Sequence, residues 1–588
     1  MLRTHRCGEL RKSDVGKTVT LTGWVDTRRD HGGLLFIDVR DRYGKTQIVF
    51  NPSQKQVYDE AQKLRSEFVI LVRGQVSPRP SGTENPKLVT GEIEVQAAEL
   101  TILSESETPP FQILDDLDVS EDIRLRYRFL DIRRKPMLNR LKTRHDIVST
   151  VRNYLNQKEF IEFETPYLTK STPEGARDFL VPSRLNEGNF YALPQSPQLF
   201  KQMLMVAGTD RYFQLARCFR DEDLRADRQY EHTQIDIEMS FVEEKDIYEL
   251  MEGMFFQIFK AIHGIEIKLP FTKMPFEDAM NRYGSDKPDL RFDLPLVELT
   301  PIFAKTEFKV FQGSIQQKGV IKGIKVSGKA FSRKDFDDLT EFAKGFGAKG
   351  LVWMKVKSAS GNELESPIAK FLSTDEIAGL IKTLEAKNDD TLFIVTGEWE
   401  RTCVVLGELR KKLAQVANLK KREGFHFLWV VDFPLLEWNE EDKRWQARHH
   451  PFTSPKLDQI QSLESDPGGV KARAYDLVLN GTEVGGGSIR IHNEKLQEQM
   501  FKVLGMSKAE AESRFGFFLK ALKFGTPPHG GIACGLDRLT AMLLGLDSIR
   551  DVIAFPKTQK GACLVSDAPS GVSDRQLKEL HIRVAKAA

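Results

Sequence analysis

An acidic stretch broken by prolines divides this chain into two regions with different periodicity. It runs from residue 104 to 122, contains Pro109 and Pro110, and has the composition of a linker. Before it, apolar and polar residues alternate in short runs, whereas after it apolar residues recur at helical spacing. The chain is therefore expected to fold as several domains, and its 588 residues leave room for about four.

Residues 1–104 are expected to form a small β-domain. Short runs of strand character are separated by turn signals such as Gly32-Gly33. The runs lie at residues 19–25, 35–37, 47–50, 68–72 and 92–95. About five strands in a domain of this size fit an oligonucleotide-binding barrel, and another small β-module is the alternative.

The remainder is expected to mix helices and strands. Apolar residues on one face predict a helix from about residue 137, namely Ile147, Val148, Val151 and Leu155. A basic run, 124–135, predicts a solvated helix face, with contact to a phosphate backbone as the alternative. We divide this part into a hinge at 105–136, a mixed segment at 137–287, an insertion at 288–423, a second mixed segment at 424–560 and an extension at 561–588.

The composition disfavours a membrane protein, a secreted protein and a zinc protein. No apolar run approaches the ~18 residues of a membrane helix, and the N-terminus lacks the apolar core of a signal peptide. The five cysteines are scattered without a CxxC pair, which disfavours a zinc site and fits free thiols in a reducing cytoplasm. The net charge of +2 argues neither for nor against nucleic-acid binding.

Three separated segments are rich in charged groups that suit phosphate chemistry. They are residues 163–166 (FETP), 219–229 (FRDEDLRADRQ) and 535–538 (GLDR). Arginine forks hold phosphate oxygens bidentately, so the arginines of the second and third segments are candidates for a nucleotide site. In order and spacing, the three segments resemble motifs 1, 2 and 3 of class II aminoacyl-tRNA synthetases.

Four further segments resemble the aspartate–tRNA ligases within that class, in their bacterial form. They are residues 171–178 (STPEGARD), 195–202 (QSPQLFKQ), 449–453 (HHPFT) and 481–490 (GTEVGGGSIR). The resemblance implies an α+β multidomain protein with an N-terminal OB-fold barrel, a catalytic domain around an antiparallel sheet, an α+β insertion domain, and a homodimeric assembly. It also implies ATP-dependent ligation of L-aspartate to tRNA through an aspartyl-adenylate, with Mg²⁺, and no DNA or membrane partner.

The same resemblance implies an ATP site. Arg220 would hold the α-phosphate and Arg538 the γ-phosphate, while Glu222 and Gln229 would contact the adenine end. Asp476 and Glu483 would hold Mg²⁺, which prefers a few carboxylates together with phosphate oxygens and water. The other residues implied at the ATP site are Asp221, Gly535, Leu536 and Asp537.

The implied aspartate pocket is cationic. Arg490, helped by Lys201, would bind the side-chain carboxylate, and Asp236 would fix those cations. Asp236 or Gln198 would hold the ammonium group, and Arg220 would also contact the substrate. The residues that would close over it are Glu174, Ser196 and His449. Such a pocket argues against relatives specific for asparagine or lysine.

The barrel is implied to read the tRNA anticodon. Arg29, Phe36 and Gln47 would share one surface, with Phe36 stacking a base and Gln47 bonding a base edge. The alternative for Phe36 is a barrel-core aromatic.

Two further barrel positions, His31 and Gly82, resemble the non-discriminating form, which charges tRNA(Asn) as well as tRNA(Asp). The alternatives are turn variation in an enzyme specific for tRNA(Asp) and, more remotely, a non-catalytic paralogue. The paralogue is disfavoured because the ATP contacts Arg220, Glu222, Glu483 and Arg538 are retained.

Overall fold

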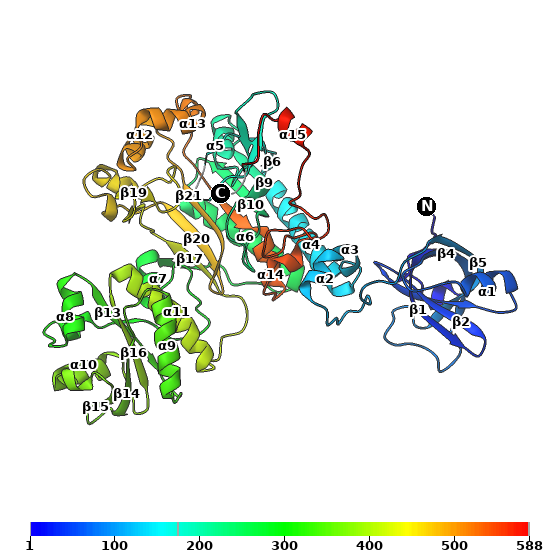
Figure 1. Cartoon of the computed structure of the whole chain (residues 1–588), viewed down its shortest axis with the longest axis horizontal. Helices are drawn as coiled ribbons and strands as arrows, with labels where there is room; N and C mark the ends of the chain where they lie inside the picture. Colours follow the sequence, from blue (N-terminus) through cyan, green and yellow to red (C-terminus); the bar gives the residue numbers. More distant parts are fainter. Residues whose placement is uncertain (1, 173–175, 586–588) are drawn as a thin grey trace. The chain divides into compact units, whose positions relative to one another are not determined.

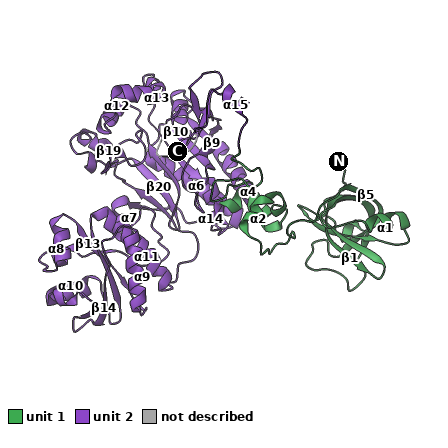
Figure 2. Ribbon diagram, in the orientation of Figure 1, with its two compact units in different colours: residues 1–142, 550–570 green, residues 143–549, 571–588 purple. Residues whose placement is uncertain are grey.

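The computed structural model describes residues 2–172 and 176–585, and the chain divides into two compact units (Figure 2). Unit 1 comprises residues 1–142 and 550–570, and unit 2 comprises residues 143–549 and 571–588. No helix among the described residues has both the length and the apolar character needed to cross a membrane. All five cysteines are free and buried.

Unit 1 begins with a closed five-stranded barrel in the strand order β1-β2-β3-β5-β4, drawn in blue in Figure 1. The strands are β1 (Thr18–His31), β2 (Leu34–Asp41), β3 (Gly44–Phe50), β4 (Val69–Pro78) and β5 (Ile93–Ser104). Alternate residues of β1, among them Val19 and Leu21, point into the barrel core. The predicted barrel is confirmed. A short helix that the sequence pattern did not predict, α1 (Lys55–Ala61), connects β3 to β4.

The basic run after the linker is largely structural. It contains α2 (Glu121–Arg126) and α3 (Arg128–Asp131), and α4 (Lys135–Gln157) follows. Arg128 is 1% exposed and forms an ion pair of 2.7 Å with Asp131. Its guanidinium also donates to the carbonyls of Arg550, Ile553 and Ala554. The prediction of a solvated face is therefore wrong for Arg128, which holds the returning segment 550–570 within unit 1.

Unit 2 is built on an eight-stranded sheet in the order β11-β17-β20-β21-β22-β10-β9-β6. Its pairs are antiparallel except β11 with β17 and β6 with β9, so the prediction of an antiparallel sheet is confirmed for the five central pairs. The strands are β6 (Ile161–Glu162), β9 (Arg211–Phe219), β10 (Glu231–Ser240), β11 (Thr272–Pro275), β17 (Phe427–Val431), β20 (Ala474–Leu479), β21 (Thr482–Ile489) and β22 (His529–Gly535).

Helices α4, α6 (Glu244–His263) and α14 (Leu536–Leu543) contribute to the main core of unit 2. The predicted face of α4 is confirmed, because Ile147, Val151 and Leu155 are fully buried there and Val148 packs beside them. The other elements outside the insertion are α5 (Gln198–Val206), β7 (Leu180–Pro182), β8 (Phe190–Ala192), α7 (Phe276–Tyr283), β18 (Leu436–Asn439), β19 (Arg444–Ala447), α12 (Glu494–Val503), α13 (Lys508–Leu522) and α15 (Asp574–Glu579).

The insertion forms its own five-stranded sheet in the order β12-β13-β16-β14-β15. Its elements are β12 (Val297–Glu298), α8 (Lys309–Gln316), β13 (Val320–Val326), α9 (Arg333–Gly345), β14 (Val352–Ser358), β15 (Glu363–Glu365), α10 (Thr374–Thr383), β16 (Thr391–Gly397) and α11 (Trp399–Val416). Two apolar clusters pack against this sheet, one including residues of α9 and α11 and the other residues of α8 and α10. The α+β insertion is thus confirmed.

Candidate active site

A cavity of about 570 Å³ opens over the middle of the large sheet, a size that suits a small-molecule site. Residues from strands β10, β21 and β22 and from helices α5 and α14 contribute to its lining. Most of the residues implied for ATP and aspartate line this one cavity: Ser196, Gln198, Lys201, Arg220, Glu222, Gln229, Asp236, His449, Glu483, Arg490, Gly535, Asp537 and Arg538.

Three consecutive glycines in the central strand β21 make room for this cavity and for the strands beside it. A Cβ on Gly485 would lie 2.3 Å from the Cys534 sulfur, and one on Gly487 would lie 2.1 Å from the Gly531 carbonyl oxygen. These distances are too short for any side chain. The central strand can therefore be formed only by residues without a Cβ at these positions.

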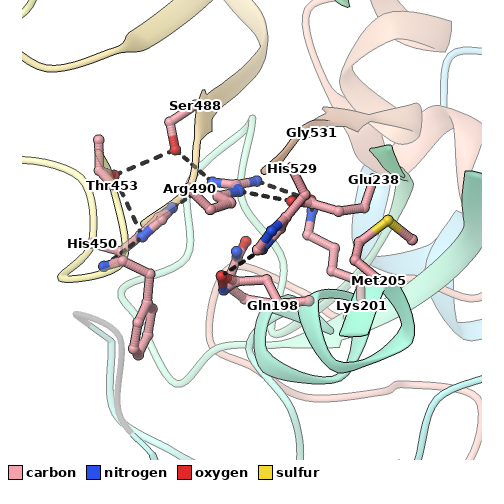
Figure 3. Close-up of polar contacts among 12 residues, drawn as sticks. Gln198, Lys201, Met205, Glu238, His450, Thr453, Ser488, Arg490, His529 and Gly531 are labelled. Atoms are coloured by element: carbon pink, nitrogen blue, oxygen red, sulfur yellow. Dashed lines mark hydrogen bonds and ion pairs between the residues drawn. The ribbon is translucent and has the colours of Figure 1, made fainter. Parts of the chain in front are cut away.

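At one end of the cavity, two buried cations meet two buried carboxylates. Figure 3 shows the two cations, Lys201 and Arg490, beside Glu238. The Lys201 ammonium lies 3.1 Å from Asp236 and 3.2 Å from Glu238. The Arg490 guanidinium donates to both oxygens of Glu238, at 3.0 and 3.2 Å. Asp236 thus contacts one of the two cations predicted for it, Lys201, whereas Arg490 is fixed by Glu238, which we did not predict. The alternation of strand β10 places residues 236 and 238 on one face, and that signal could have found it.

The two carboxylates differ in their ionisation. Burial raises the pKa of Asp236 to about 6, because Lys201 only partly offsets the loss of water. Burial acts on Glu238 in the same direction, but Arg490 and Lys201 outweigh it and hold its pKa below the usual value. Glu238 is therefore the counter-ion of Arg490 and shares Lys201 with Asp236, whose Oδ1 atom has no hydrogen-bond partner among the described residues.

Neutral groups fix the other edge of Arg490. Its Nη1 atom donates to Ser488 Oγ at 2.7 Å and lies 2.6 Å from His450 Nε2 (Figure 3). Burial and the charge of Arg490 keep the pKa of His450 well below its usual value, so His450 is neutral and accepts this hydrogen bond. Burial and Arg448 likewise lower the pKa of His449 to about 4. Arg490 is oriented before any substrate arrives.

The opposite part of the cavity presents hydrogen-bond donors. Arg538 of α14 donates to the Glu483 carbonyl at 3.0 Å, and the backbone of Arg220 bonds that of Tyr230 at 2.8 Å. The buried Nε atoms of both arginines, and Nε2 of Gln198, have no hydrogen-bond partner among the described residues. Buried donors are nearly always paired, so three orphaned donors around one cavity fit a ligand rich in acceptors, such as a phosphate or carboxylate.

Asp476 of β20 and Glu483 of β21 converge above Gly486. A Cβ on that glycine would lie 2.6 Å from Asp476 Oδ1 and 3.5 Å from Glu483 Oε1. Burial and the charge of Glu483 raise the pKa of Asp476 well above its usual value. No group of three or more His, Cys, Asp or Glu ligands for a metal occurs within residues 2–172 and 176–585. Two carboxylates fit Mg²⁺, which takes its other ligands from phosphate and water.

Other implied residues lie elsewhere in unit 2. Leu536 is fully buried in the core, and Asp221 lies 3.5 Å from Arg177. Asp537 lines the cavity, but its carboxylate accepts from Arg144 at 2.7 Å and from the Thr233 backbone at 2.9 Å. It therefore anchors α14. Glu174 lies outside the described residues.

The implied anticodon residues cluster on the barrel of unit 1. The Arg29 guanidinium bonds Gln47 at 3.1 Å and Asp38 at 2.9 Å. Phe36 pairs with Arg29 across β1 and β2 and stays outside the barrel core, which contains its neighbours Leu35 and Ile37. The three residues thus share one surface, and the barrel-core alternative for Phe36 is wrong.

The two positions that resemble the non-discriminating form lie in turns of the barrel domain. His31 is exposed at the end of β1, immediately before Gly32-Gly33. Gly82 follows β4 with φ +84°, and no atom lies within 4 Å of the position that a Cβ would occupy. Larger side chains therefore have space at residue 82 but must adopt a strained backbone.

Two family models match separate parts of the chain. A family model described as tRNA synthetases class II (D, K and N) matches residues 120–559, and one described as OB-fold nucleic acid binding domain matches residues 19–103. The chain is 56% identical to the aspartate–tRNA(Asp/Asn) ligase of Desulfatibacillum aliphaticivorans, over 100% of this chain and 98% of the relative. It is also 56% identical to the protein of that description from Caldanaerobacter subterraneus subsp. tengcongensis, over 99% and 98%.

A solved structure described as asparaginyl-tRNA synthetase from Pyrococcus horikoshii complexed with asparaginyl-adenylate has the same fold. It superposes with a TM-score of 0.58 at 18% identity, covering 95% of this chain and 99% of that one.

Proposed function

The chain belongs to the class II tRNA synthetases of the D, K and N group, and we propose that it ligates L-aspartate to tRNA at the expense of ATP. The observation that carries the substrate assignment is the buried Arg490, which is fixed on Glu238 and accompanied by Lys201 in the same cavity as two arginines with orphaned donors. One end of this cavity suits a carboxylate side chain, and the other suits phosphates.

In the first step, a carboxylate oxygen of aspartate attacks the α-phosphorus of ATP, and the bond from that phosphorus to the bridging oxygen breaks. The products are aspartyl-adenylate and pyrophosphate. The attacking group is already ionised, so the protein need only position the reactants and stabilise charge. We assign Arg220 to the α-phosphate, Arg538 to the γ-phosphate, and Glu222 with Gln229 to the adenine end.

In the second step, a hydroxyl of the terminal ribose of tRNA attacks the carbonyl carbon of the adenylate. An ester forms, and the bond to AMP breaks. Asp476 and Glu483 would hold Mg²⁺, which would neutralise phosphate charge when bound. We assign the ammonium group of aspartate to Asp236 and Gln198, with Ser196, His449 and Glu174 closing over it.

The end of the cavity that contains Arg490 and Lys201 discriminates against asparagine. Arg490 and Lys201 would face a neutral amide, whose NH₂ group cannot accept a hydrogen bond from either. A site built for a particular hydrogen-bonding partner rejects an isostere that lacks it far more strongly than an apolar pocket does.

We propose further that both tRNA(Asp) and tRNA(Asn) are substrates, read by the barrel surface of Arg29, Phe36 and Gln47. The support is the pair His31 and Gly82, together with relatives described as aspartate–tRNA(Asp/Asn) ligases. We also propose a cytoplasmic location, because none of the five cysteines, all within the described residues, forms a disulfide.

A homodimer is the assembly we propose. Large apolar side chains flank the motif 1 segment and are exposed in the single chain: Ile161 by 51%, Tyr167 by 42% and Leu168 by 54%. Exposed apolar groups close together mark protein–protein contact surfaces.

The deciding experiment is charging of purified tRNA(Asp) and tRNA(Asn) with labelled aspartate, side by side. Comparable charging of both is expected. Charging of tRNA(Asp) alone would support the ligase activity and contradict the proposal that tRNA(Asn) is a second substrate. Absence of aspartate-dependent exchange between ATP and pyrophosphate would contradict the proposed ligase activity itself.

A further inference from the structure

A loop at the base of the insertion carries an ion pair that has no role in the scheme above. Residues 284–296 connect α7 to the insertion sheet. Within them, the Lys287 ammonium lies 3.2 Å from Asp286 Oδ1, and their side chains are 46% and 36% exposed. Both groups are therefore accessible to a ligand.

The loop is fixed at both ends. At its start, Gly284 (φ +66°) packs so closely on α11 that a Cβ would lie 2.1 Å from the Cys403 carbonyl oxygen. Further on, the Arg291 guanidinium bonds Asp289 at 2.7 and 2.9 Å and the Asn480 carbonyl at 3.4 Å. Because residue 480 lies in the turn between β20 and β21, the loop is fastened beside the strands that carry the two converging carboxylates.

A buried arginine of the insertion strengthens this attachment. Arg410 of α11 is 1% exposed and lies 4.0 Å from the Phe292 ring centroid. Its guanidinium donates to three loop carbonyls, those of Asp289, Phe292 and Leu294. The insertion thus fixes the backbone that follows Lys287.

Lys287 lies within the electrostatic field of the candidate metal site. Partial burial lowers the pKa of Lys287, but the charges of Asp286, Glu483 and Asp476 more than offset it and raise the pKa above its usual value. Packing places the loop there as well: a Cβ on Gly481, two residues before Glu483, would lie 2.8 Å from the Cβ of Asp289. The exposed ammonium group is therefore carried by a loop that packs beside the strands of the two carboxylates that would hold Mg²⁺.

We infer that Lys287 binds the pyrophosphate portion of ATP, exchanging its contact with Asp286 for phosphate oxygens. This inference rests on the proposed function and adds a residue to it. When the bond between the α-phosphorus and the bridging oxygen breaks, negative charge accumulates on the leaving pyrophosphate. An ammonium group offers three donors and a compact positive charge, which suits that product. Asp286 holds the lysine beside the site until phosphate replaces it.

The test uses the full chain and measures binding as well as turnover. Magnesium pyrophosphate is titrated calorimetrically into wild type, Lys287→Met, Lys287→Arg and Asp286→Asn, and the KM values for ATP and aspartate are measured by exchange. Lys287→Met should weaken pyrophosphate binding at least about tenfold and leave the KM for aspartate within about twofold. Lys287→Arg should retain most of the affinity, and Asp286→Asn should retain all of it.

Lys260→Met is the matched control, because it removes another exposed lysine paired with a carboxylate, Glu266 at 2.9 Å. Unchanged pyrophosphate affinity in Lys287→Met would overturn the inference. So would equal losses in Lys287→Met and Asp286→Asn, which would indicate a merely structural ion pair. Absence of aspartate-dependent exchange in wild type would instead overturn the proposed function, and the calorimetric comparison would still decide the role of Lys287.

Discussion

The end of the cavity that would receive the substrate side chain contains two cations and two carboxylates, all buried. Lys201 and Arg490 are each in contact with Glu238, so the charges balance before a ligand is present. Removing one partner from such a group leaves an uncompensated buried charge, which is far more costly than losing a surface ion pair. Glu238 is therefore a positioning residue, because it acts on substrate only through the two cations.

Replacement of Glu238 by glutamine tests that role. Arg490 would lose its counter-ion, and the KM for aspartate should rise at least about tenfold, with a smaller change in the KM for ATP. Kinetics of exchange between ATP and pyrophosphate at varied aspartate measure both values. Glu231→Gln, on the same strand but in a partly exposed pair with Arg217, is the control and should change neither. Parallel rises in both KM values would show that Glu238 only stabilises the fold.

The exposed His31 gives a prediction about tRNA selection. His31→Leu should lower charging of tRNA(Asn) more than charging of tRNA(Asp), because residue 31 lies at the tip of the β1–β2 hairpin and not in the barrel core. The ratio of kcat/KM for the two tRNAs measures the effect. Equal losses on both tRNAs would refute a role in selection.

Single residues of the site were predictable to different degrees. Positions such as Arg220 and Arg490 belong to segments that resemble a known family, and both line the cavity. Glu238 was not singled out: strand alternation places it on the same face as Asp236, but its contacts with Arg490 and Lys201 depend on segments distant in the sequence. The burial of Asp537 depends on Arg144, which is 393 residues away in the sequence, and no local pattern contains that contact.

At the scale of elements, helix α11 connects the insertion to the rest of unit 2. This helix packs against α7 through glycine, and Arg410 fixes the loop that carries Lys287. The insertion, for which the sequence predicts no catalytic pattern, therefore contributes to the geometry of the site without placing its own side chains in it.

Arg410→Met should consequently affect stability and phosphate binding together. It leaves three loop carbonyls without their donor, and the free energy of unfolding should fall by about 2–4 kcal/mol. Pyrophosphate affinity should fall as well, since the loop loses its attachment. Chemical denaturation and calorimetry measure the two effects. Lys411→Met, which removes an exposed lysine of the same helix, should leave both unchanged, and unaltered stability in Arg410→Met would contradict the attachment.

Elements with a strong periodic pattern were predicted well. The five barrel strands and the apolar face of α4 lie where the spacing of apolar residues places them, although β1 and β5 extend well beyond the predicted runs 19–25 and 92–95. Helix α1 has only seven residues, too few to establish a period. The prediction for the basic run was wrong for another reason. Arg128 is buried by a segment more than 400 residues later in the chain, so the local sequence could not distinguish an exposed helix face from a buried one.

At the scale of the whole molecule, protonation of buried histidines makes stability depend on pH. Burial lowers the pKa of His232 to about 3 and that of His449 to about 4, and that of His450 lies well below 6.5. An unfolded histidine binds its proton near pH 6.5, whereas these folded ones do not. Their stabilising contribution is therefore complete above that pH and falls as the pH drops toward 4, by up to about 1.4 kcal/mol per pH unit each.

Two carboxylates of unit 2 act in the opposite sense. The folded pKa of Asp236 is about 6, above its usual 3.8, and that of Asp476 also lies well above its usual value, so both stabilise the fold as the pH falls toward 4. The histidines outnumber them, because the pKa values of His492 and His529 are lowered as well. Unfolding by urea should accordingly show unit 2 to be less stable at pH 5 than at pH 7. His449→Gln should reduce that difference, and the exposed His31→Gln should not. Greater stability at pH 5 would contradict the assignment.

The glycine-only stretch of β21 has a consequence for inheritance. The strand requires residues without a side chain at positions 485–487. Any amino-acid change there adds a Cβ that collides with Cys534, Asp476 or the Gly531 carbonyl. A genetic screen of all substitutions should find these codons among the least tolerant in the gene, although they encode no reactive group. Selection here preserves empty space, which a search for chemically active side chains would overlook.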